Sequence, residues 1–205
     1  MVRDAFRFLI PLLLLFVLFL AYDLVVPALL CLALGAFVGF FFRNPRRDIP
    51  GGEKLVVSPA DGKVVRVSKL DTHAGQPGGH SVSIFLSVFN VHVNRAPIGG
   101  RLAGLEYRRG RFKAAFDDEA SRINEQNILT IRGQEIEVVV KQIAGLIARR
   151  VVCWKHEGDA VGRGELFGLI RFGSRVDVHL PERVRLRVKP GDRVQGGTSI
   201  LAEYG

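Results

Sequence analysis

The chain has 205 residues, of which 48% are hydrophobic and 24% are charged, and its formal net charge is +9 at pH 7. This composition excludes a disordered or collagen-like chain, and the length allows one or two modest domains. The charges among the first 42 residues cancel, so the positive excess lies in residues 43–205 and favours an anionic partner. Cys31 and Cys153 lack the number and spacing of a disulfide framework or a metal site, which predicts a reducing compartment and no bound metal.

Residues 8–42 form an apolar stretch in which Asp23 is the only charged side chain. A single straight helix of this length would be about 52 Å long at 1.5 Å per residue, whereas the hydrocarbon core of a membrane is about 30 Å thick. Tyr22, Asp23 and Pro27 interrupt the stretch near its middle. The sequence therefore predicts that residues 1–42 form a membrane-associated helical hairpin with Asp23 at its tip.

The flanking charges predict how this hairpin is oriented. Arginines precede it and follow it, and because positive residues favour the cytoplasmic side, both ends are expected at the cytoplasmic face of the cell membrane. The first half, residues 8–21, would be only about 21 Å long as a helix, so the sequence leaves open two transmembrane helices or a re-entrant hairpin in one leaflet. A cleaved signal peptide is disfavoured because the hydrophobic stretch continues well beyond the usual length of a signal.

The remaining chain is predicted to be mainly β. Residues 43–53 form a basic, proline-containing linker, and residues 54–205 consist of short apolar runs separated by Gly, Pro and Asp. In residues 175–180 and 184–189, apolar residues alternate with charged ones, so each segment is expected to be a strand with one dry and one wet face.

A partial internal repeat refines the predicted architecture. GDAVGRG at 158–164 and GDRVQGG at 191–197 are both Gly-Asp turns followed by Val and further Gly. Similar turns occur in the β-sandwiches of biotinyl and lipoyl carriers, which present a modifiable Lys at a hairpin tip, and this chain has no equivalent Lys turn. The expectation is a barrel-sandwich-like β domain preceded by an N-terminal hydrophobic helical hairpin, without carrier function.

Three segments contain the residues that point to chemistry. The sequence has no P-loop, GxGxxG, HExxH or GxSxG pattern, so no motif supports a nucleotide-binding, zinc-protease or esterase function. The three segments are SPADGKV at 58–64, FLSVFNVHVNRAP at 85–97 and RFGSRVDVHLP at 171–181. Ser174 has the same strand parity as Val176, so its hydroxyl is expected on the dry face, where a buried hydroxyl needs a partner.

These segments and the hydrophobic N-terminus resemble the short-form phosphatidylserine decarboxylase proenzymes, including relatives that act on archaeal serine lipids. The resemblance covers nearly the whole chain, and LFGLIRFGSRVDVHLP at 166–181 is its most specific signature. It implies autocatalytic cleavage between Gly173 and Ser174: Ser174 Oγ attacks the Gly173 carbonyl, β-elimination leaves dehydroalanine, and hydrolysis gives a pyruvoyl group and ammonia. The products would be a β chain of residues 1–173 and an α chain of residues 174–205, so the cut would divide the β-rich catalytic domain, residues 54–205, into two parts.

The resemblance also implies a reaction and the residues that perform it. The pyruvoyl ketone would form a Schiff base with the serine amine of phosphatidylserine and act as the electron sink for decarboxylation to phosphatidylethanolamine, with no metal or nucleotide cofactor. His92 would be the base for self-cleavage and a later proton donor, and Asp61 would orient or polarise it. Arg95 stands where longer bacterial relatives carry a second His, and would bind the substrate's phosphate or carboxylate.

Each of these residues also has an ordinary structural explanation. A lone strand histidine such as His92 is more often structural than catalytic, Asp61 lies in a common Asp-Gly turn, and a Gly-Ser pair is expected by chance in a chain this long. The competing hypotheses are a non-enzymatic, membrane-tethered module that binds anionic lipid or protein, and a proenzyme that fails to process. For the enzyme, the expected partners are a serine phospholipid (phosphatidylserine or archaetidylserine), the membrane and further αβ pairs in a homo-oligomer, with no nucleic acid.

Overall fold

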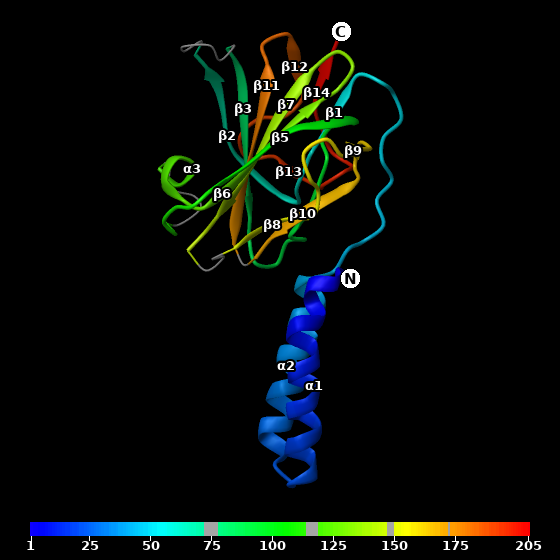
Figure 1. Ribbon diagram of the computed structural model, residues 1–205, viewed down its shortest axis with the longest axis vertical. Helices are drawn as coiled ribbons and strands as arrows, with labels where there is room; N and C mark the ends of the chain where they lie inside the picture. The colour runs from blue at the N-terminus through cyan, green and yellow to red at the C-terminus, as the bar shows by residue number, and fades with distance from the viewer. Residues whose placement is uncertain (72–77, 114–118, 147–149, 172) are drawn as a thin grey trace. The chain divides into compact units, whose positions relative to one another are not determined.

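The chain divides into two compact units, a helical one and a mainly β one. The computed structural model describes residues 1–71, 78–113, 119–146, 150–171 and 173–205 (Figure 1). The units are Met1–Arg46 and Arg47–Gly205. A mainly β structure preceded by a pair of apolar helices confirms the predicted fold class.

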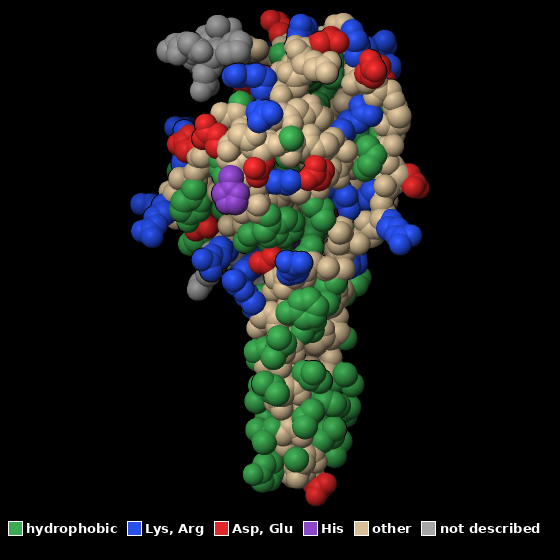
Figure 2. Space-filling view, turned by 45° about the vertical axis from the view of Figure 1, so that its right-hand side comes forward, with side chains coloured by type: hydrophobic (Ala, Val, Ile, Leu, Met, Phe, Trp, Pro, Cys, Tyr) green, Lys and Arg blue, Asp and Glu red, His purple; other side chains and the backbone are tan. Residues whose placement is uncertain are grey.

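The helical unit is a hairpin of two apolar helices, α1 (Phe6–Ala21) and α2 (Val25–Phe41), preceded by the short 3-10 helix η1 (Arg3–Ala5). Asp23 lies in the turn between them with a left-handed φ of 56°, a conformation that Asp adopts more readily than most residues. Most large side chains on both helices are exposed hydrophobics (Figure 2). By length and composition, Arg3–Ala21 could cross a membrane, which hints at membrane association.

The β unit has three antiparallel sheets in its described residues. Its elements are β1 (Leu55–Val57), β2 (Gly62–Leu70), β3 (Gly79–Leu86), β4 (Val93–Arg95), β5 (Gly100–Arg108), α3 (Ala120–Ile123), β6 (Gln126–Arg132), β7 (Glu137–Ala144), β8 (Val151–Cys153), β9 (Ala160–Val161), β10 (Leu166–Ile170), β11 (Ser174–Pro181), β12 (Val184–Leu186), β13 (Arg193–Val194) and β14 (Ile200–Tyr204). The largest sheet is curled and has the order β13-β2-β3-β11-β7-β6-β5-β9 (Figure 1). The two smaller sheets are β1-β14-β12 and β4-β10-β8.

Strand β11 runs through the middle of the large sheet, with β3 on one side and β7 on the other. Its inward residues Val176 and Val178 are fully buried and lie opposite Ile84 and Val82 of β3, which are also fully buried. The hydrophobic core therefore sits on the concave side of this sheet, where the alternation in the sequence places it.

The outer face of β11 differs from the expected wet face. Arg175 and Asp177 are each only 3% exposed. The Arg175 guanidinium donates through Nε to Asp177 Oδ1 at 2.6 Å and through Nη2 to Ser83 Oγ at 2.8 Å. The expectation of a wet face is wrong for this strand, because charged side chains can be buried when they pair with each other and with a hydroxyl. The second alternating segment is a strand only over Val184–Leu186.

The two repeated Gly-Asp turns meet at one side chain. Gly164 and Gly197 end the two turns with left-handed φ values of 77° and 81°. A Cβ at Gly164 would overlap the Ile49 side chain, and a Cβ at Gly197 would lie 3.0 Å from Ile49 Cδ1. Both turns of the repeat thus pack against Ile49, in the segment that precedes β1. Arg163 contacts the same segment through a hydrogen bond of 2.7 Å from Nη2 to the Pro50 carbonyl.

Candidate active site

Ser174 is the first residue of the central strand β11, and its hydroxyl is buried. It pairs with Leu86 of β3 and with Ala144 of β7, and it is 0% exposed. Within the described residues, Ser174 Oγ has no hydrogen-bond partner. A buried polar group left unpaired costs about 1–3 kcal/mol, so this hydroxyl destabilises the fold and is a candidate for reaction.

Gly173, directly before Ser174, has a left-handed φ of 67°. A Cβ built on Gly173 would meet no atom within 4 Å. The backbone conformation, rather than lack of space, is therefore what favours glycine here. The extended conformation of strand β11 begins with the next residue, Ser174.

His92 is 1% exposed, and its two ring nitrogens have different partners. Nδ1 lies 2.9 Å from the carbonyl oxygen of Asn90, while Nε2 lies 3.3 Å from the backbone nitrogen of Gly173. Because a carbonyl can only accept, we assign the ring proton to Nδ1, and Nε2 then accepts the Gly173 N–H. The imidazole is thus a neutral base whose accepting nitrogen meets the N–H of Gly173, the residue before Ser174.

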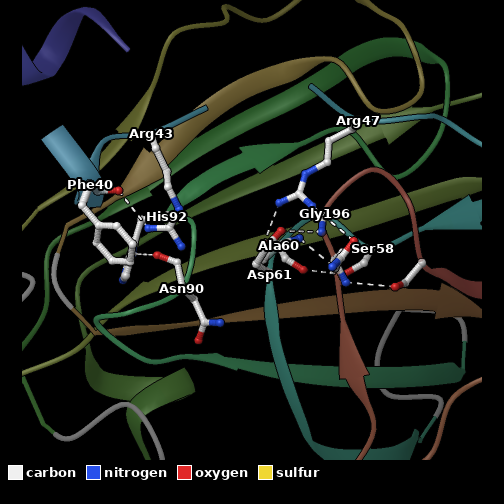
Figure 3. A network of polar contacts seen from close by, with 11 residues as sticks. Phe40, Arg43, Arg47, Ser58, Ala60, Asp61, Asn90, His92 and Gly196 are labelled. Carbon is white, nitrogen blue, oxygen red and sulfur yellow. Dashed lines mark hydrogen bonds and ion pairs between the residues drawn. The ribbon is translucent and has the colours of Figure 1, made fainter. Parts of the chain in front are cut away.

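The turn before His92 explains the position of the Asn90 carbonyl. Ser87 donates to Asn90 Oδ1 through its backbone N–H at 2.9 Å and through Oγ at 2.8 Å. The Asn90 N–H in turn donates to the Ser87 carbonyl at 2.9 Å. Asn90 therefore closes the turn with its side chain and orients His92 with its backbone (Figure 3).

A chain of buried amides connects the large sheet to the strand that follows His92. Asn127 Nδ2 donates to Gln142 Oε1 at 3.0 Å, and Gln142 Nε2 donates to Asn94 Oδ1 at 2.8 Å and to the Val152 carbonyl at 3.3 Å. The Val152 carbonyl can only accept, so it fixes which way the Gln142 amide points and hence the orientation of its neighbours. Sequence reasoning missed Gln142 and Asn127; the available signal was a polar residue at an inward position of an apolar strand.

Asp61 belongs to a different network from His92. Its carboxylate forms an ion pair with Arg47 Nη2 at 2.7 Å and accepts the Gly196 N–H at 2.7 Å (Figure 3). The side chains of Arg47 and Asp61 are only 11% and 15% exposed. In the described structure Asp61 is not hydrogen bonded to His92, whose Nδ1 is oriented by a backbone carbonyl instead.

Arg95 lies beside the Asp61 network. Its Nη1 donates to the Gly164 carbonyl at 2.9 Å. Burial lowers the pKa of the Arg95 guanidinium, the Arg47 charge lowers it further, and the Asp61 carboxylate raises it. Two guanidinium groups thus lie near one carboxylate, which leaves a positive site suited to an anionic group. The structure brings Gly173, Ser174 and His92 together, and it groups Asp61 with Arg95, which lies on β4 three residues after His92.

Comparisons with known proteins place this chain among relatives of one kind. A family model described as phosphatidylserine decarboxylase matches residues 34–202. A phosphatidylserine decarboxylase proenzyme of Syntrophus aciditrophicus (strain SB) is 49% identical over 180 residues, covering 86% of this chain and 84% of the relative. Proenzymes of the same name from Geotalea uraniireducens (strain Rf4) and Carboxydothermus hydrogenoformans are 50% identical over 171 residues and 46% identical over 175 residues. They cover 80% and 84% of this chain, and 78% and 82% of the relatives. These matches confirm the resemblance inferred from the sequence.

Proposed function

Because this chain belongs to the phosphatidylserine decarboxylase family, we propose that it converts phosphatidylserine to phosphatidylethanolamine with a pyruvoyl group made from its own Ser174. The observation that carries the proposal is the contact of His92 Nε2 with the Gly173 N–H, next to a buried Ser174 hydroxyl that has no described partner. A neutral imidazole at Gly173 and an unpaired hydroxyl on the next residue are the parts that self-cleavage requires.

Self-cleavage begins at the Ser174 hydroxyl. His92 Nε2 takes the proton of Ser174 Oγ as the oxygen attacks the Gly173 carbonyl carbon, and the Ser174 nitrogen leaves and is protonated, giving an ester. Loss of the Ser174 Cα proton then expels the Gly173 carboxylate and leaves dehydroalanine at position 174. Addition of water and release of ammonia convert the dehydroalanine to the pyruvoyl group. The left-handed φ of Gly173 supports this step, because it turns the chain at the bond that breaks.

The pyruvoyl group supplies an electron sink for the charge left when carbon dioxide departs from the serine headgroup. The residues present fit such a group: position 174 lies in a buried interior, and His92 is close enough to hold or deliver a proton there. Arg95 and Arg47 are proposed to bind the substrate's phosphate or carboxylate, and Asp61 to keep these guanidiniums in place. A direct catalytic role of Asp61 stays a prediction.

The α chain, residues 174–205, is expected to stay in the protein after cleavage. It begins with β11, which is hydrogen bonded to β3 and β7 along both edges. The buried Arg175–Asp177 pair anchors the new end to Ser83 of β3. We place the enzyme at the cytoplasmic face of the cell membrane, supported by the apolar hairpin, as αβ pairs that assemble further. The acyl or ether tails are left open, so archaetidylserine is an alternative substrate.

A denaturing intact-mass spectrum of the purified protein tests the proposal. The expected result is a 173-residue piece and a 32-residue piece that carries a pyruvoyl terminus. The Ser174→Ala variant should remain a single chain of about 22.6 kDa and release no carbon dioxide from phosphatidylserine. An intact wild-type chain that persists with membrane lipid would favour a binding module or an inactive proenzyme, and cleavage of the Ser174→Ala variant at this bond would exclude the pyruvoyl mechanism.

A further inference from the structure

Exposed apolar side chains in the β unit are not spread evenly. Among the described residues of this unit, the large hydrophobic side chains that are exposed are Ile49, Val65, Phe89, Tyr107 and Leu146. The two most exposed are Phe89 at 69% and Leu146 at 63%. Both lie in loops rather than on a strand face, so their exposure is not a by-product of sheet alternation.

These two loops leave the sheet at the same end, the end that carries Ser174. Phe89 comes three residues after Leu86, the last residue of β3, and Leu146 comes two residues after Ala144, the last residue of β7. Leu86 and Ala144 are the two register partners of Ser174. The Phe89 and Leu146 loops therefore flank the place where the chain reaches the reactive bond.

The loop at Phe89 is a fixed turn. Asn90 Oδ1 accepts both the backbone N–H and the hydroxyl of Ser87, and the Asn90 N–H donates to the Ser87 carbonyl. The same turn orients His92 through the Asn90 carbonyl. The Phe89 side chain, which is 69% exposed, thus belongs to a turn that also orients His92. An exposed apolar residue on a rigid turn is typical of a contact surface.

The described charged side chains in the loops next to Ser174 are of one sign. We define the loop rim as the described residues of the three segments next to Ser174, which are residues 87–90, 145–146, 150, 171 and 173. The loop rim contains Arg150 and Arg171 and no Asp or Glu. Arg150 is exposed, and a backbone hydrogen bond of 3.3 Å from the Arg171 N–H to the Arg150 carbonyl joins two of the loops.

We propose that the loop rim is a docking surface for an anionic lipid bilayer, with Phe89 and Leu146 inserted among the acyl chains and the arginines at the headgroups. Apolar tips next to basic residues bind such an interface by hydrophobic insertion and by attraction to its negative surface potential. This inference rests on the proposed function, because a lipid substrate must pass from the bilayer to position 174. It assigns membrane contact to the β unit itself, independently of the apolar hairpin.

Fluorescence quenching tests the insertion. In the full chain, Trp154→Phe removes the single tryptophan, and Phe89→Trp or Leu146→Trp places a probe on the loop rim. Gln134→Trp is the matched control, since Gln134 is exposed in the loop that precedes β7, at the opposite end of that strand. In vesicles of brominated phosphatidylglycerol and phosphatidylcholine, the probes at 89 and 146 should be quenched and blue-shifted and the probe at 134 should not. Equal quenching at all three positions, or none at 89 and 146, would overturn the proposal.

Kinetics provide a second test. The Phe89→Ser/Leu146→Ser double variant should raise the KM for phosphatidylserine in vesicles by about tenfold, because two apolar contacts with the bilayer are lost. Its turnover of a soluble short-chain phosphatidylserine and its self-cleavage should match the wild type. An equal loss of activity on both substrates would contradict docking to a bilayer. An unchanged KM on vesicles would also contradict it, and would be the result if the loop rim bound a protein instead. Failure of the proposed function appears separately: the wild-type chain stays uncleaved, while the Phe89→Trp and Leu146→Trp variants still report insertion.

Discussion

His92 Nε2 lies 3.3 Å from the backbone nitrogen of Gly173, although the two residues are 81 positions apart in the chain. Because Nδ1 of the ring is paired with the Asn90 carbonyl, Nε2 is the nitrogen that accepts the N–H of Gly173, the residue before Ser174. The fold thus places a base at the residue that precedes the buried Ser174 hydroxyl.

The first prediction concerns this base. His92→Ala should slow self-cleavage by roughly 10²–10⁴-fold, the usual contribution of a positioned general base. The measurement is the appearance of the 32-residue piece over time in a denaturing mass spectrum. His156→Ala is the control, because the His156 side chain is 88% exposed. Normal processing of His92→Ala would remove His92 from the mechanism.

The second prediction separates conformation from crowding at Gly173. Gly173→Ala should slow cleavage, because the left-handed conformation costs an L-residue about 1–2 kcal/mol and alanine will shift the scissile bond toward other conformations. Gly158→Ala is a matched control: Gly158 also has a positive φ, 91°, and a Cβ there also meets no atom within 4 Å. Both variants should lose similar stability, and only Gly173→Ala should cleave slowly. Equal cleavage rates would show that the conformation of Gly173 is not part of the reaction.

The sequence predicted the features that depend on local pattern. Alternation placed the Ser174 hydroxyl on the same side as Val176, and both are fully buried in the structure. The interruption of the apolar stretch at Tyr22, Asp23 and Pro27 predicted the turn between the two helices. These features need only the neighbours of each residue along the chain, because strand parity and helix interruption are local properties.

Features that depend on the partner of a side chain could not be read from the sequence. Alternation gave no sign that Arg175 and Asp177 are buried, because their burial comes from pairing with each other and with Ser83. Asp61 was expected near His92, but a linker residue, Arg47, supplies its counter-charge. Such contacts are set by tertiary packing between segments that no periodicity connects.

The third prediction tests the Asp61 network by a double-mutant cycle. Asp61→Asn and Arg47→Met, singly and together, should show a coupling in unfolding free energy of about 0.5–3 kcal/mol, because the two side chains form a largely buried ion pair. Urea unfolding of the uncleavable Ser174→Ala chain measures it. Additive effects would contradict the pairing. In chains that retain Ser174, cleavage that is slower for Asp61→Asn than for Arg47→Met would support a direct role of Asp61 in the reaction.

The fourth prediction concerns the buried amide chain. Gln142→Met should lower the unfolding free energy by about 1–3 kcal/mol, because it leaves the Asn94 and Asn127 amides without their shared partner. It should also slow self-cleavage, since Asn94 lies two residues from His92. Gln134→Met, at an exposed position, is the control and should change neither quantity. A Gln142→Met variant that is destabilised but cleaves at the wild-type rate would show that the amide chain does not position His92.

The fifth prediction is a pH dependence of stability that arises from His179. Burial, followed by the positive charge of Lys141, lowers the pKa of His179 to about 4 from its ordinary value of 6.5. Below pH 6.5 the unfolded chain therefore binds a proton that the folded chain does not. The unfolding free energy should fall by up to roughly 3 kcal/mol between pH 6.5 and 4 and lose no more from this group at lower pH. In the uncleavable Ser174→Ala chain, His179→Gln should reduce this slope, whereas the same change at exposed His156 should leave it intact. An unchanged slope in His179→Gln would assign the acid sensitivity to other groups.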